Sequence, residues 1–260
     1  MQRVPIETKF SDFPSAFHPI LLGAQLYDSS CSPEASVYYI DKGDGFFLKT
    51  APKGTLSQEA AMTQLYHNLG FAPAVLEFAQ EKADWLLTAR VKGEDCIHPQ
   101  YLDDPRRLSA LLGQSLRALH DAPLPEGVPN RTAAYIDTAW ENYRRGVYDA
   151  TLFPDNWGYR SAEEAWAVVE STAPKLQCDT LIHGDYCLPN IILQDWKLSA
   201  FIDLGAAGAG DRHIDLFWGA WTLVFNLKTD AWRNRFLDAY GRDKINTDIL
   251  NSIGAFEVFG

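Results

Sequence analysis

Short runs of aromatic and β-branched residues, separated by turn-forming residues, occupy the first third of the chain. Runs of this kind are typical of β-strands, and they predict strands at residues 19–27, 35–41, 45–50, 74–80 and 84–91. One segment differs, because Ala61, Leu65 and Leu69 recur four residues apart and Gly70 follows them. This spacing predicts a helix over residues 56–70 that ends at the glycine. Together these segments indicate a small antiparallel sheet with one helix on a face.

After Gly93 the hydrophobic pattern takes on the period of a helix. Leucines recur on one stripe between Leu108 and Leu119, behind the helix-start signal Asp104-Pro105. Further helices are expected at residues 131–148, 161–171, 211–227 and 245–259, with short strands at residues 180–182, 191–193 and 199–202. The pattern predicts an α+β chain of two lobes, a β-rich lobe of residues 1–90 and a mainly helical lobe of residues 91–260.

Composition narrows the choice of partners. With 47% hydrophobic and 13% aromatic residues among 260, we expect a packed core and not a disordered chain. A net charge of −11 argues against nucleic acids and anionic membranes as partners, and it would attract a cationic small molecule. The four cysteines form no CxxC pair, and no run reaches the ~18 apolar residues of a membrane span. We therefore expect a cytoplasmic protein, either a monomer or a homodimer.

Three polar residues in the second half have the chemistry that phosphoryl transfer requires. That reaction needs a group to orient the attacking hydroxyl and oxygen ligands for the metal ions that bridge the phosphates. Asp185 lies five residues before Asn190, so one loop can direct both side chains into one space. Asp203 follows the apolar run Ala-Phe-Ile, and Gly205 permits a sharp turn behind it. Each residue alone would be read as an ordinary turn or cap residue, and it is their combination that favours catalysis.

The segments HGDYCLPNIIL and FIDLGAAGAGDRHIDL resemble the catalytic and metal-binding loops of kinases, with Gly184 where protein kinases usually have Arg. They resemble more closely the aminoglycoside phosphotransferases, and among these the aminoglycoside 3'-phosphotransferases. The resemblance implies a protein-kinase-like fold and ATP- and Mg²⁺-dependent phosphorylation of an antibiotic hydroxyl. It implies that Asp185 is the catalytic base or orienter and that Asn190 and Asp203 bind Mg²⁺. His183 and Asp215 match residues that brace the loop by hydrogen bonds.

The same resemblance extends to the nucleotide-binding lobe. Lys49 matches the lysine that reaches the ATP phosphates, and Glu59, ten residues later, matches its ion-pair partner. Phe47 faces the same side of the strand as Lys49 and matches an aromatic residue that stacks on adenine. The remaining nucleotide candidates are two serines in the covering loop and two hinge residues whose backbone would read the base: Ser32, Ser36, Ala89 and Val91. GTP in place of ATP stays open.

Four residues match positions that contact the cationic antibiotic in the family: Asp155, Asn156, Glu257 and Phe259. Carboxylates suit this task because charged hydrogen bonds to ammonium groups are strong. The sequence also departs from the family, with Ala206 and Trp221 where arginines are usual and Gly158 where Glu is expected. These departures leave room for a kinase of the same fold that acts on another antibiotic, a choline-like alcohol or a sugar. A non-catalytic nucleotide-binding module is the third possibility.

Overall fold

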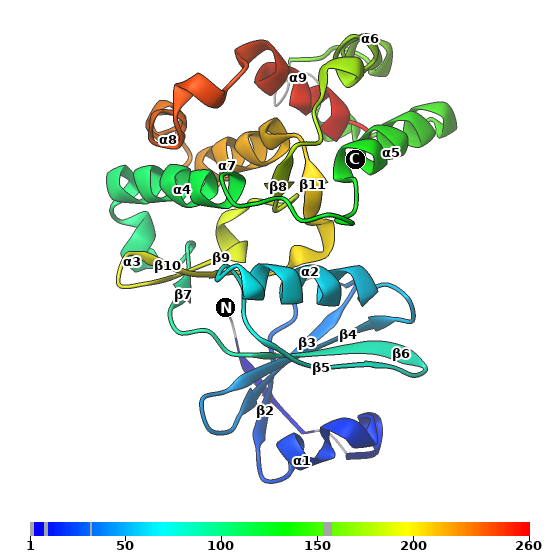
Figure 1. Cartoon of the computed structure of the whole chain (residues 1–260), viewed down its shortest axis with the longest axis vertical. Coiled ribbons are helices and arrows are strands. Elements are labelled where there is room, and N and C mark those ends of the chain that lie inside the picture. Colours follow the sequence, from blue (N-terminus) through cyan, green and yellow to red (C-terminus); the bar gives the residue numbers. More distant parts are fainter. Residues whose placement is uncertain (1–2, 8–9, 32, 153–157) are drawn as a thin grey trace. The chain divides into compact units, whose positions relative to one another are not determined.

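The computed structural model describes residues 3–7, 10–31, 33–152 and 158–260 (Figure 1). The chain forms two compact units. One unit comprises residues 1–98 and 189–205, and the other comprises residues 99–188 and 206–260. The first unit is built on a β-sheet and the second mainly on helices, which confirms the predicted fold class.

The β-rich unit contains a six-stranded antiparallel sheet in the order β1-β2-β3-β4-β6-β5. Its strands are β1 (Val4–Ile6), β2 (Gln25–Asp28), β3 (Ser36–Asp41), β4 (Phe46–Pro52), β5 (Val75–Gln80) and β6 (Ala83–Ala89). Helix α2 (Ser57–Asn68) lies along the sheet, and the short α1 (His18–Leu21) lies at the far end of this unit (Figure 1). A second sheet of this unit, in the order β10-β9-β7, is formed by β7 (Glu94–Asp95), β9 (Ile191–Gln194) and β10 (Lys197–Phe201).

Strand β4 divides its side chains between two hydrophobic clusters. Leu48 is fully buried and packs with Phe17, Ile40 and Leu87. Ala51, three residues further on, packs with residues of α2 and β6 on the opposite face. Because side chains alternate along a strand, Phe47 and Lys49 lie on the same face as Ala51, which α2 covers. The alternation therefore places Lys49 against α2, where Glu59 resides.

The helical unit contains the helices α3 (Pro99–Leu102), α4 (Pro105–His120), α5 (Arg131–Arg145), α6 (Ala162–Thr172), α7 (Arg212–Leu227), α8 (Arg233–Tyr240) and α9 (Thr247–Glu257). A two-stranded antiparallel sheet of β8 (Thr180–Ile182) and β11 (Gly208–Gly210) lies among them (Figure 1). The N-cap side chains of Asp104, Asn130 and Ser161 each accept a hydrogen bond from a backbone N–H of the first turn. Short 3-10 turns include η5 (Leu188–Asn190) and η6 (Leu204–Ala206). None of the described helices is long and apolar enough to span a membrane.

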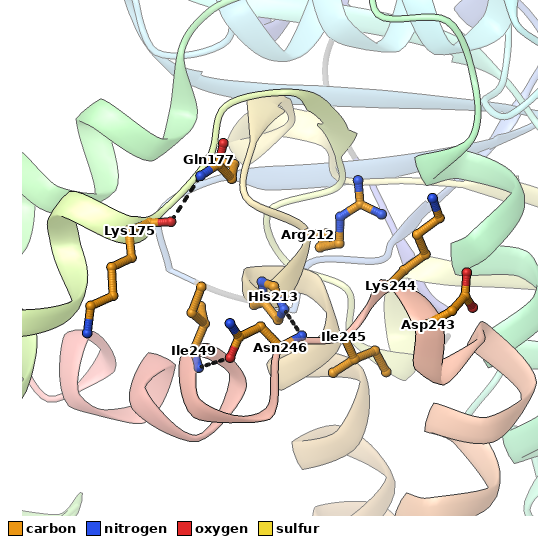
Figure 2. Close-up of a pocket in the computed structure, with 9 residues that line it drawn as sticks. All are labelled: Lys175, Gln177, Arg212, His213, Asp243, Lys244, Ile245, Asn246 and Ile249. Atoms are coloured by element: carbon orange, nitrogen blue, oxygen red, sulfur yellow. Dashed lines mark hydrogen bonds between the residues drawn. The ribbon is translucent and has the colours of Figure 1, made fainter.

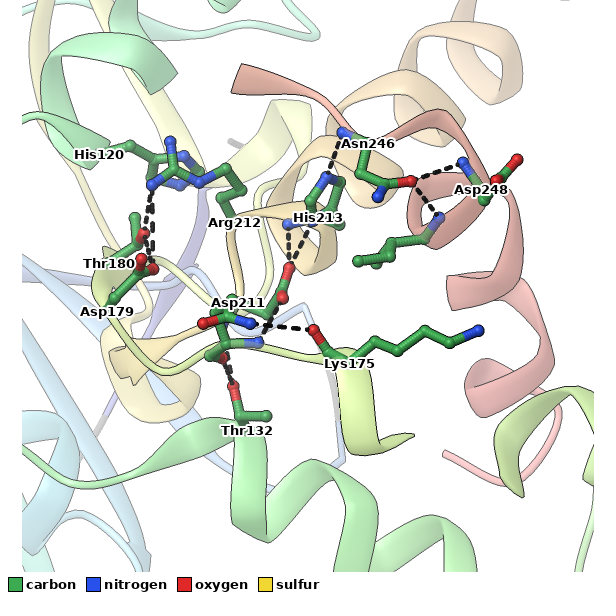
Figure 3. Close-up of polar contacts among 12 residues, drawn as sticks. His120, Thr132, Lys175, Asp179, Thr180, Asp211, Arg212, His213, Asn246 and Asp248 are labelled. Atoms are coloured by element: carbon green, nitrogen blue, oxygen red, sulfur yellow. Dashed lines mark hydrogen bonds and ion pairs between the residues drawn. The ribbon is translucent and has the colours of Figure 1, made fainter. Parts of the chain in front are cut away.

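A buried polar network joins the beginnings of three helices in this unit (Figure 3). Asp211, the N-cap of α7, accepts hydrogen bonds from His213 Nδ1 at 2.6 Å and from Gln177 N–H at 2.7 Å. His213 Nε2 accepts the N–H of Asn246, the N-cap of α9, at 2.9 Å. Thr132 Oγ1, at the start of α5, accepts the N–H of Asp211 at 2.8 Å. The network fixes these helix ends relative to one another and to Gln177, which precedes strand β8.

The predicted element pattern is wrong in a few places. The strand expected at residues 19–27 begins only at Gln25, because Pro19 lies in the first turn of α1, where proline is well tolerated. The pattern missed the strands β1, β7 and β11 and the helices α3 and α8. Strands of two or three residues are too short to show a period, and β11 consists of Gly, Ala and Gly. Their pairing partners, not their local sequence, make them strands.

Candidate active site

Lys49 is held between two carboxylates within the β-rich unit. Its Nζ donates to Glu59 Oε2 at 2.8 Å and to Asp203 Oδ1 at 2.8 Å. The predicted Lys49–Glu59 ion pair is therefore present, and the short connection of residues 53–56 between β4 and α2 lets the two side chains, ten residues apart in the sequence, meet. The Glu59 side chain is 9% exposed and that of Asp203 is 52% exposed. Lys49 is thus anchored on the buried side and reaches towards solvent on the other.

The electrostatics of this triad keep the lysine charged. Burial alone would lower the pKa of Lys49, but the Glu59 and Asp203 carboxylates outweigh it and raise the pKa above its usual value. Burial also raises the pKa of Glu59, and the Lys49 ammonium opposes that rise. A permanently charged lysine with one exposed carboxylate beside it suits the binding of phosphate groups and a cation.

The β9–β10 hairpin brings Asn190 and Asp203 together. Ile191 pairs with Phe201 in this hairpin, and Ile202 N–H donates to Asn190 O at 2.9 Å. Asn190 precedes the first strand and Asp203 follows the second, so both lie at the open end of the hairpin. Asp203 has φ of 60°, a left-handed conformation that costs free energy for residues other than Gly and that Asp and Asn tolerate best. Strain of this kind concentrates at functional sites.

The segment that carries Asp185 belongs to the helical unit and is braced by one carboxylate. Asp215 Oδ2 accepts the N–H of His183 at 2.7 Å, and Asp215 Oδ1 accepts the N–H of Gly184 at 2.7 Å. His183 Nδ1 accepts the N–H of Asp185 at 3.3 Å. These bonds confirm the expected bracing role of His183 and Asp215. Gly184 has φ of 82°, and a Cβ there would lie 2.2 Å from Ala206 O, so no larger residue fits this turn.

The predicted nucleotide-binding face of the sheet carries aromatic side chains. Phe47 and Tyr39 lie opposite each other on β4 and β3, with ring centroids 5.3 Å apart. The Arg3 guanidinium lies over the Tyr39 ring at 3.7 Å. Sequence reasoning missed Arg3, because nothing local marks a single arginine near the N-terminus. Flat side chains on this face are compatible with stacking on a base, and the role of Phe47 stays a prediction.

Three of the other four nucleotide candidates lie among the described residues. Ala89 N–H donates to Ala74 O at 2.9 Å, whereas Val91 N–H donates to no residue that the structure describes. The Val91 amide is therefore available to a ligand. Ser36 begins β3 at the edge of the loop, which is closed by a hydrogen bond of 2.9 Å from Val37 N–H to Ser30 Oγ. Ser32 lies outside the described residues.

On the helical unit, Glu257 is held by residues of two other helices. Tyr135 Oη donates to Glu257 Oε1 at 2.6 Å, and the Trp218 side chain donates a second hydrogen bond. Burial raises the pKa of Glu257 to about 7, the hydrogen bonds from Tyr135 and Trp218 oppose the rise, and the charge of Asp185 adds to it. The influence of Asp185 shows that Glu257 and the predicted catalytic carboxylate lie within electrostatic range. Tyr135 was missed in the sequence because its partner is 122 residues away.

For the other three residues predicted to bind the acceptor, the described part of the chain shows no polar contact that would support this role. Phe259 is 1% exposed and packs edge-on against Tyr143 and Trp166, so its side chain belongs to a hydrophobic cluster. Its contact with substrate stays a prediction. Asp155 and Asn156 lie outside the part of the chain that the structure describes. Trp221, one of the departures from the family pattern, stacks on Phe225 with centroids 4.9 Å apart.

The described residues of the helical unit line a pair of pockets, among others. The larger, of about 660 Å³, is lined by Lys175, Arg212, Lys244 and polar residues around the start of α9 (Figure 2). None of the predicted site residues that the structure describes lines it. The smaller, of about 160 Å³, is lined by Arg131, Tyr135, Ile182, Gly184 and Ala206, among others. It therefore lies between the turn that precedes Asp185 and the hydrogen-bond partner of Glu257, and it is the pocket associated with the candidate catalytic residues.

Comparison with known proteins identifies the family. Residues 33–249 match the model of the Phosphotransferase enzyme family. The chain belongs to this family. A probable aminoglycoside 3'-phosphotransferase of Lactococcus lactis subsp. lactis (strain IL1403) is 45% identical over 251 residues, which cover 95% of each protein. An aminoglycoside 3'-phosphotransferase of Niallia circulans is 27% identical over 82% of this chain and 83% of the relative. The family shared with these relatives confirms the resemblance seen in the catalytic segments.

Solved structures of phosphotransferases share the fold of this family member. An aminoglycoside 3'-phosphotransferase of type VIII superposes with a TM-score of 0.68 at 21% identity, covering 96% of both chains. An aminoglycoside phosphotransferase of Streptomyces rimosus in complex with ADP and streptomycin superposes with a TM-score of 0.67 at 23% identity, covering 85% of this chain and 90% of that one. At these identities the likeness establishes the fold.

Proposed function

We propose that this protein transfers the γ-phosphoryl group of ATP to a hydroxyl of an aminoglycoside antibiotic, the 3'-hydroxyl, and thereby inactivates the drug. The observation that carries the proposal is the arrangement of Lys49 between buried Glu59 and exposed Asp203. This arrangement presents a fixed ammonium and a free carboxylate oxygen, which are the partners that nucleotide phosphates and their metal ion require. The 45% identity to the Lactococcus relative supports the choice of acceptor.

The described residues fit the nucleotide and Mg²⁺ by the chemistry of their donors. Asp203 offers a half-exposed carboxylate and Asn190 a carboxamide oxygen from the same end of a hairpin, and Mg²⁺ prefers oxygen ligands. We therefore propose that these two residues hold Mg²⁺, which when bound neutralises charge on the phosphates. Lys49 binds phosphate oxygens, Phe47 stacks on the base, and the Val91 amide reads its edge. Ser32 and Ser36 belong to the loop that covers the nucleotide.

In this proposal, Asp185 orients the acceptor hydroxyl and accepts its proton. The acceptor oxygen forms a bond to the γ-phosphorus while the bond from that phosphorus to the ADP oxygen breaks, so ADP leaves with the electron pair. The two N–H bonds to Asp215 fix the turn before Asp185, so the carboxylate is positioned before substrate binds. Pre-positioning of this kind lowers the entropic part of the barrier.

The acceptor is a polycation, and the protein carries a net charge of −11. We propose that Glu257, with Asp155 and Asn156, binds its ammonium groups. Phe259 is the fourth residue of this proposed acceptor-binding set. A cytoplasmic location is part of the proposal, because ATP is available there and all four cysteines are free thiols.

The test is a kinase assay with purified protein, ATP and Mg²⁺ on a panel of aminoglycosides. Kanamycin B and tobramycin differ only at the 3' position, where tobramycin lacks the hydroxyl. We expect phosphorylation of kanamycin B and not of tobramycin, and a loss of about a thousandfold in kcat for Asp185→Asn. The matched control is Asp195→Asn, in the exposed turn between β9 and β10, which should keep full activity. Phosphorylation of tobramycin would refute the 3' position, and ATP hydrolysis with no phosphorylated drug would refute the acceptor class.

A second candidate acceptor class is favoured by one observation. Trp218, Trp221 and Phe225 form a continuous row of aromatic rings on α7, with centroid distances of 5.3 and 4.9 Å. Such a row offers an apolar face to a sugar or to a different antibiotic, in place of the charged positions usual in the family. The same panel, extended with neutral sugars and choline, separates this candidate from the aminoglycosides. Nucleotide binding without any phosphorylated acceptor would favour the non-catalytic module.

A further inference from the structure

Arg131 occupies an unusual position at the start of α5. It is the first residue of the helix, after the N-cap Asn130, where the helix dipole disfavours a positive charge. Its side-chain stem lies against Gly208 of β11, and a Cβ at Gly208 would be 2.5 Å from Arg131 Cγ. Gly208 pairs with Ile182, the last residue of β8 before the turn that leads to Asp185. The stem of Arg131 therefore packs on β11, beside the strand that leads into the predicted catalytic segment.

The Arg131 guanidinium forms no hydrogen bond or ion pair with any residue that the structure describes. Its side chain is half-buried, and burial lowers its pKa from the usual value. An arginine nevertheless stays protonated at any physiological pH. A partly desolvated charge without a counter-ion costs free energy, and surface arginines usually avoid this cost by turning into solvent. The side chain is therefore poised for a ligand group that the protein itself does not supply.

The pocket of about 160 Å³ shows where that ligand group would bind. Arg131 lines it together with Tyr135, Thr138, Gly184 and Ala206, and none of the described lining residues is acidic. Gly184 directly precedes Asp185, and Tyr135 donates to Glu257. One edge of the pocket thus adjoins the proposed catalytic carboxylate and another adjoins the proposed ammonium-binding carboxylate. A substrate that engages both carboxylates has part of its structure in front of Arg131.

We propose that Arg131 determines acceptor specificity, because its guanidinium donates hydrogen bonds to a hydroxyl or ring oxygen of the acceptor and repels amino groups from this pocket. The inference rests on the proposed function and deepens it. An aminoglycoside carries both hydroxyl and amino substituents, and a fixed positive charge distinguishes the two. The oxygen accepts a charge-assisted hydrogen bond, whereas an ammonium at the same place meets a like charge. Amino groups of the acceptor then bind on the Glu257 side of the pocket, and hydroxyl groups bind on the Arg131 side.

The experiment compares pairs of aminoglycosides that differ by one amino group in place of one hydroxyl. Paromomycin and neomycin form one such pair, and kanamycin A and kanamycin B form another. The ratio of kcat/KM values within each pair is measured for wild type, Arg131→Gln and Arg131→Lys. The control is Arg145→Gln, on the exposed last turn of the same helix. Melting temperature and KM for ATP are recorded for each variant.

We expect wild type to prefer the hydroxyl member of at least one pair by about tenfold or more, which corresponds to about 1.4 kcal/mol. Arg131→Gln should reduce this preference to about twofold or less, and Arg131→Lys should keep most of it. Arg145→Gln should leave the ratios unchanged. In Arg131→Gln, KM for ATP should stay unchanged, because the guanidinium supports no described contact. The melting temperature should not fall, because the helix start loses an unfavourable charge.

Other outcomes separate this inference from the proposed function. Equal ratios in wild type and Arg131→Gln, or no preference in wild type, would overturn the role of Arg131 and leave the kinase activity standing. If wild type binds the compounds in calorimetry without phosphorylating them, the proposed function fails and the affinity ratios decide the role of Arg131. If no member of either pair is bound or phosphorylated, both proposals fall.

Discussion

Lys49 and Asp203 are 154 residues apart in the sequence, and their side chains meet in an ion pair of 2.8 Å. The buried Glu59 holds the other side of the ammonium at 2.8 Å. Strand β4, helix α2 and the β9–β10 hairpin each supply one member of this triad. A lysine between one buried and one exposed carboxylate is fixed in place yet open to a phosphate.

Replacement of Lys49 by Met removes the ammonium and keeps much of the aliphatic stem. We expect kcat/KM for ATP to fall about hundredfold or more, since one pre-positioned charged donor is lost. Steady-state kinetics at saturating acceptor measure the effect. Lys82→Met, in the exposed turn between β5 and β6, is the matched control and should change kcat/KM less than about twofold. A Lys49→Met enzyme with near wild-type kcat/KM would show that the triad is structural only.

Asp203→Asn separates the charge of Asp203 from its backbone conformation. Asn tolerates the left-handed φ of 60° as Asp does, so we expect the free energy of unfolding to change little. Activity should fall about a hundredfold, because the carboxylate proposed to bind Mg²⁺ becomes a neutral amide. Asp203→Ala should add about 1 kcal/mol of destabilisation from backbone strain. Chemical denaturation and a Mg²⁺ titration of activity measure both effects, and activity above a tenth of wild type in Asp203→Asn would contradict the metal role.

Asp215→Asn tests the brace beneath the catalytic turn. The new amide can accept only one of the two backbone N–H bonds of His183 and Gly184, and its own N–H₂ faces the other. We expect a loss of about 2 to 4 kcal/mol in the free energy of unfolding, because a buried donor is left unpaired. Asp238→Asn, which breaks an exposed ion pair with Arg242, should cost less than about 1 kcal/mol. Equal losses in the two variants, measured by urea denaturation, would argue against the brace.

Glu257 gives the folded protein a stability that depends on pH. Its pKa in the folded state is about 7, above the value of 4.5 for an unperturbed glutamate. The folded state therefore resists ionisation, and stability is lost as the pH rises from about 4.5 to about 7. Glu257→Gln removes this loss. We expect the stability of the variant relative to wild type to increase by about 2 to 3 kcal/mol between about pH 4.5 and about pH 8.

Two variants serve as controls for this pH dependence. Glu170→Gln, on the exposed face of α6, should show a constant difference from wild type over the same pH range. Asp185→Asn removes a charge that raises the pKa of Glu257, so the midpoint of the wild-type pH profile should move down. Thermal denaturation at a series of pH values measures both. A flat Glu257→Gln difference would mean that Glu257 ionises normally.

The sequence alone determined most of the regular elements and indicated the candidate reacting groups. The periods of two and of about 3.6 residues placed the strands β3 to β6 and the longer helices, because those periods reflect which face of an element is buried. Asp104 was predicted to mark the start of α4, and its side chain caps that helix in the structure. The loop from His183 to Asn190 and the later Asp203 indicated phosphoryl transfer, since that chemistry needs few residue types at short spacing.

Only the tertiary structure decided which distant residues meet. Tyr135 and Glu257, 122 residues apart, share a hydrogen bond of 2.6 Å that no local pattern encodes. Likewise the strand β11 exists because Gly208 pairs with Ile182, and the missing side chain of Gly208 leaves room for the stem of Arg131. Local sequence fixes backbone conformation through sterics and capping, whereas contacts between distant segments depend on how the whole chain packs. The reaction could therefore be predicted from the sequence, and the proposed acceptor pocket could be found only from the fold.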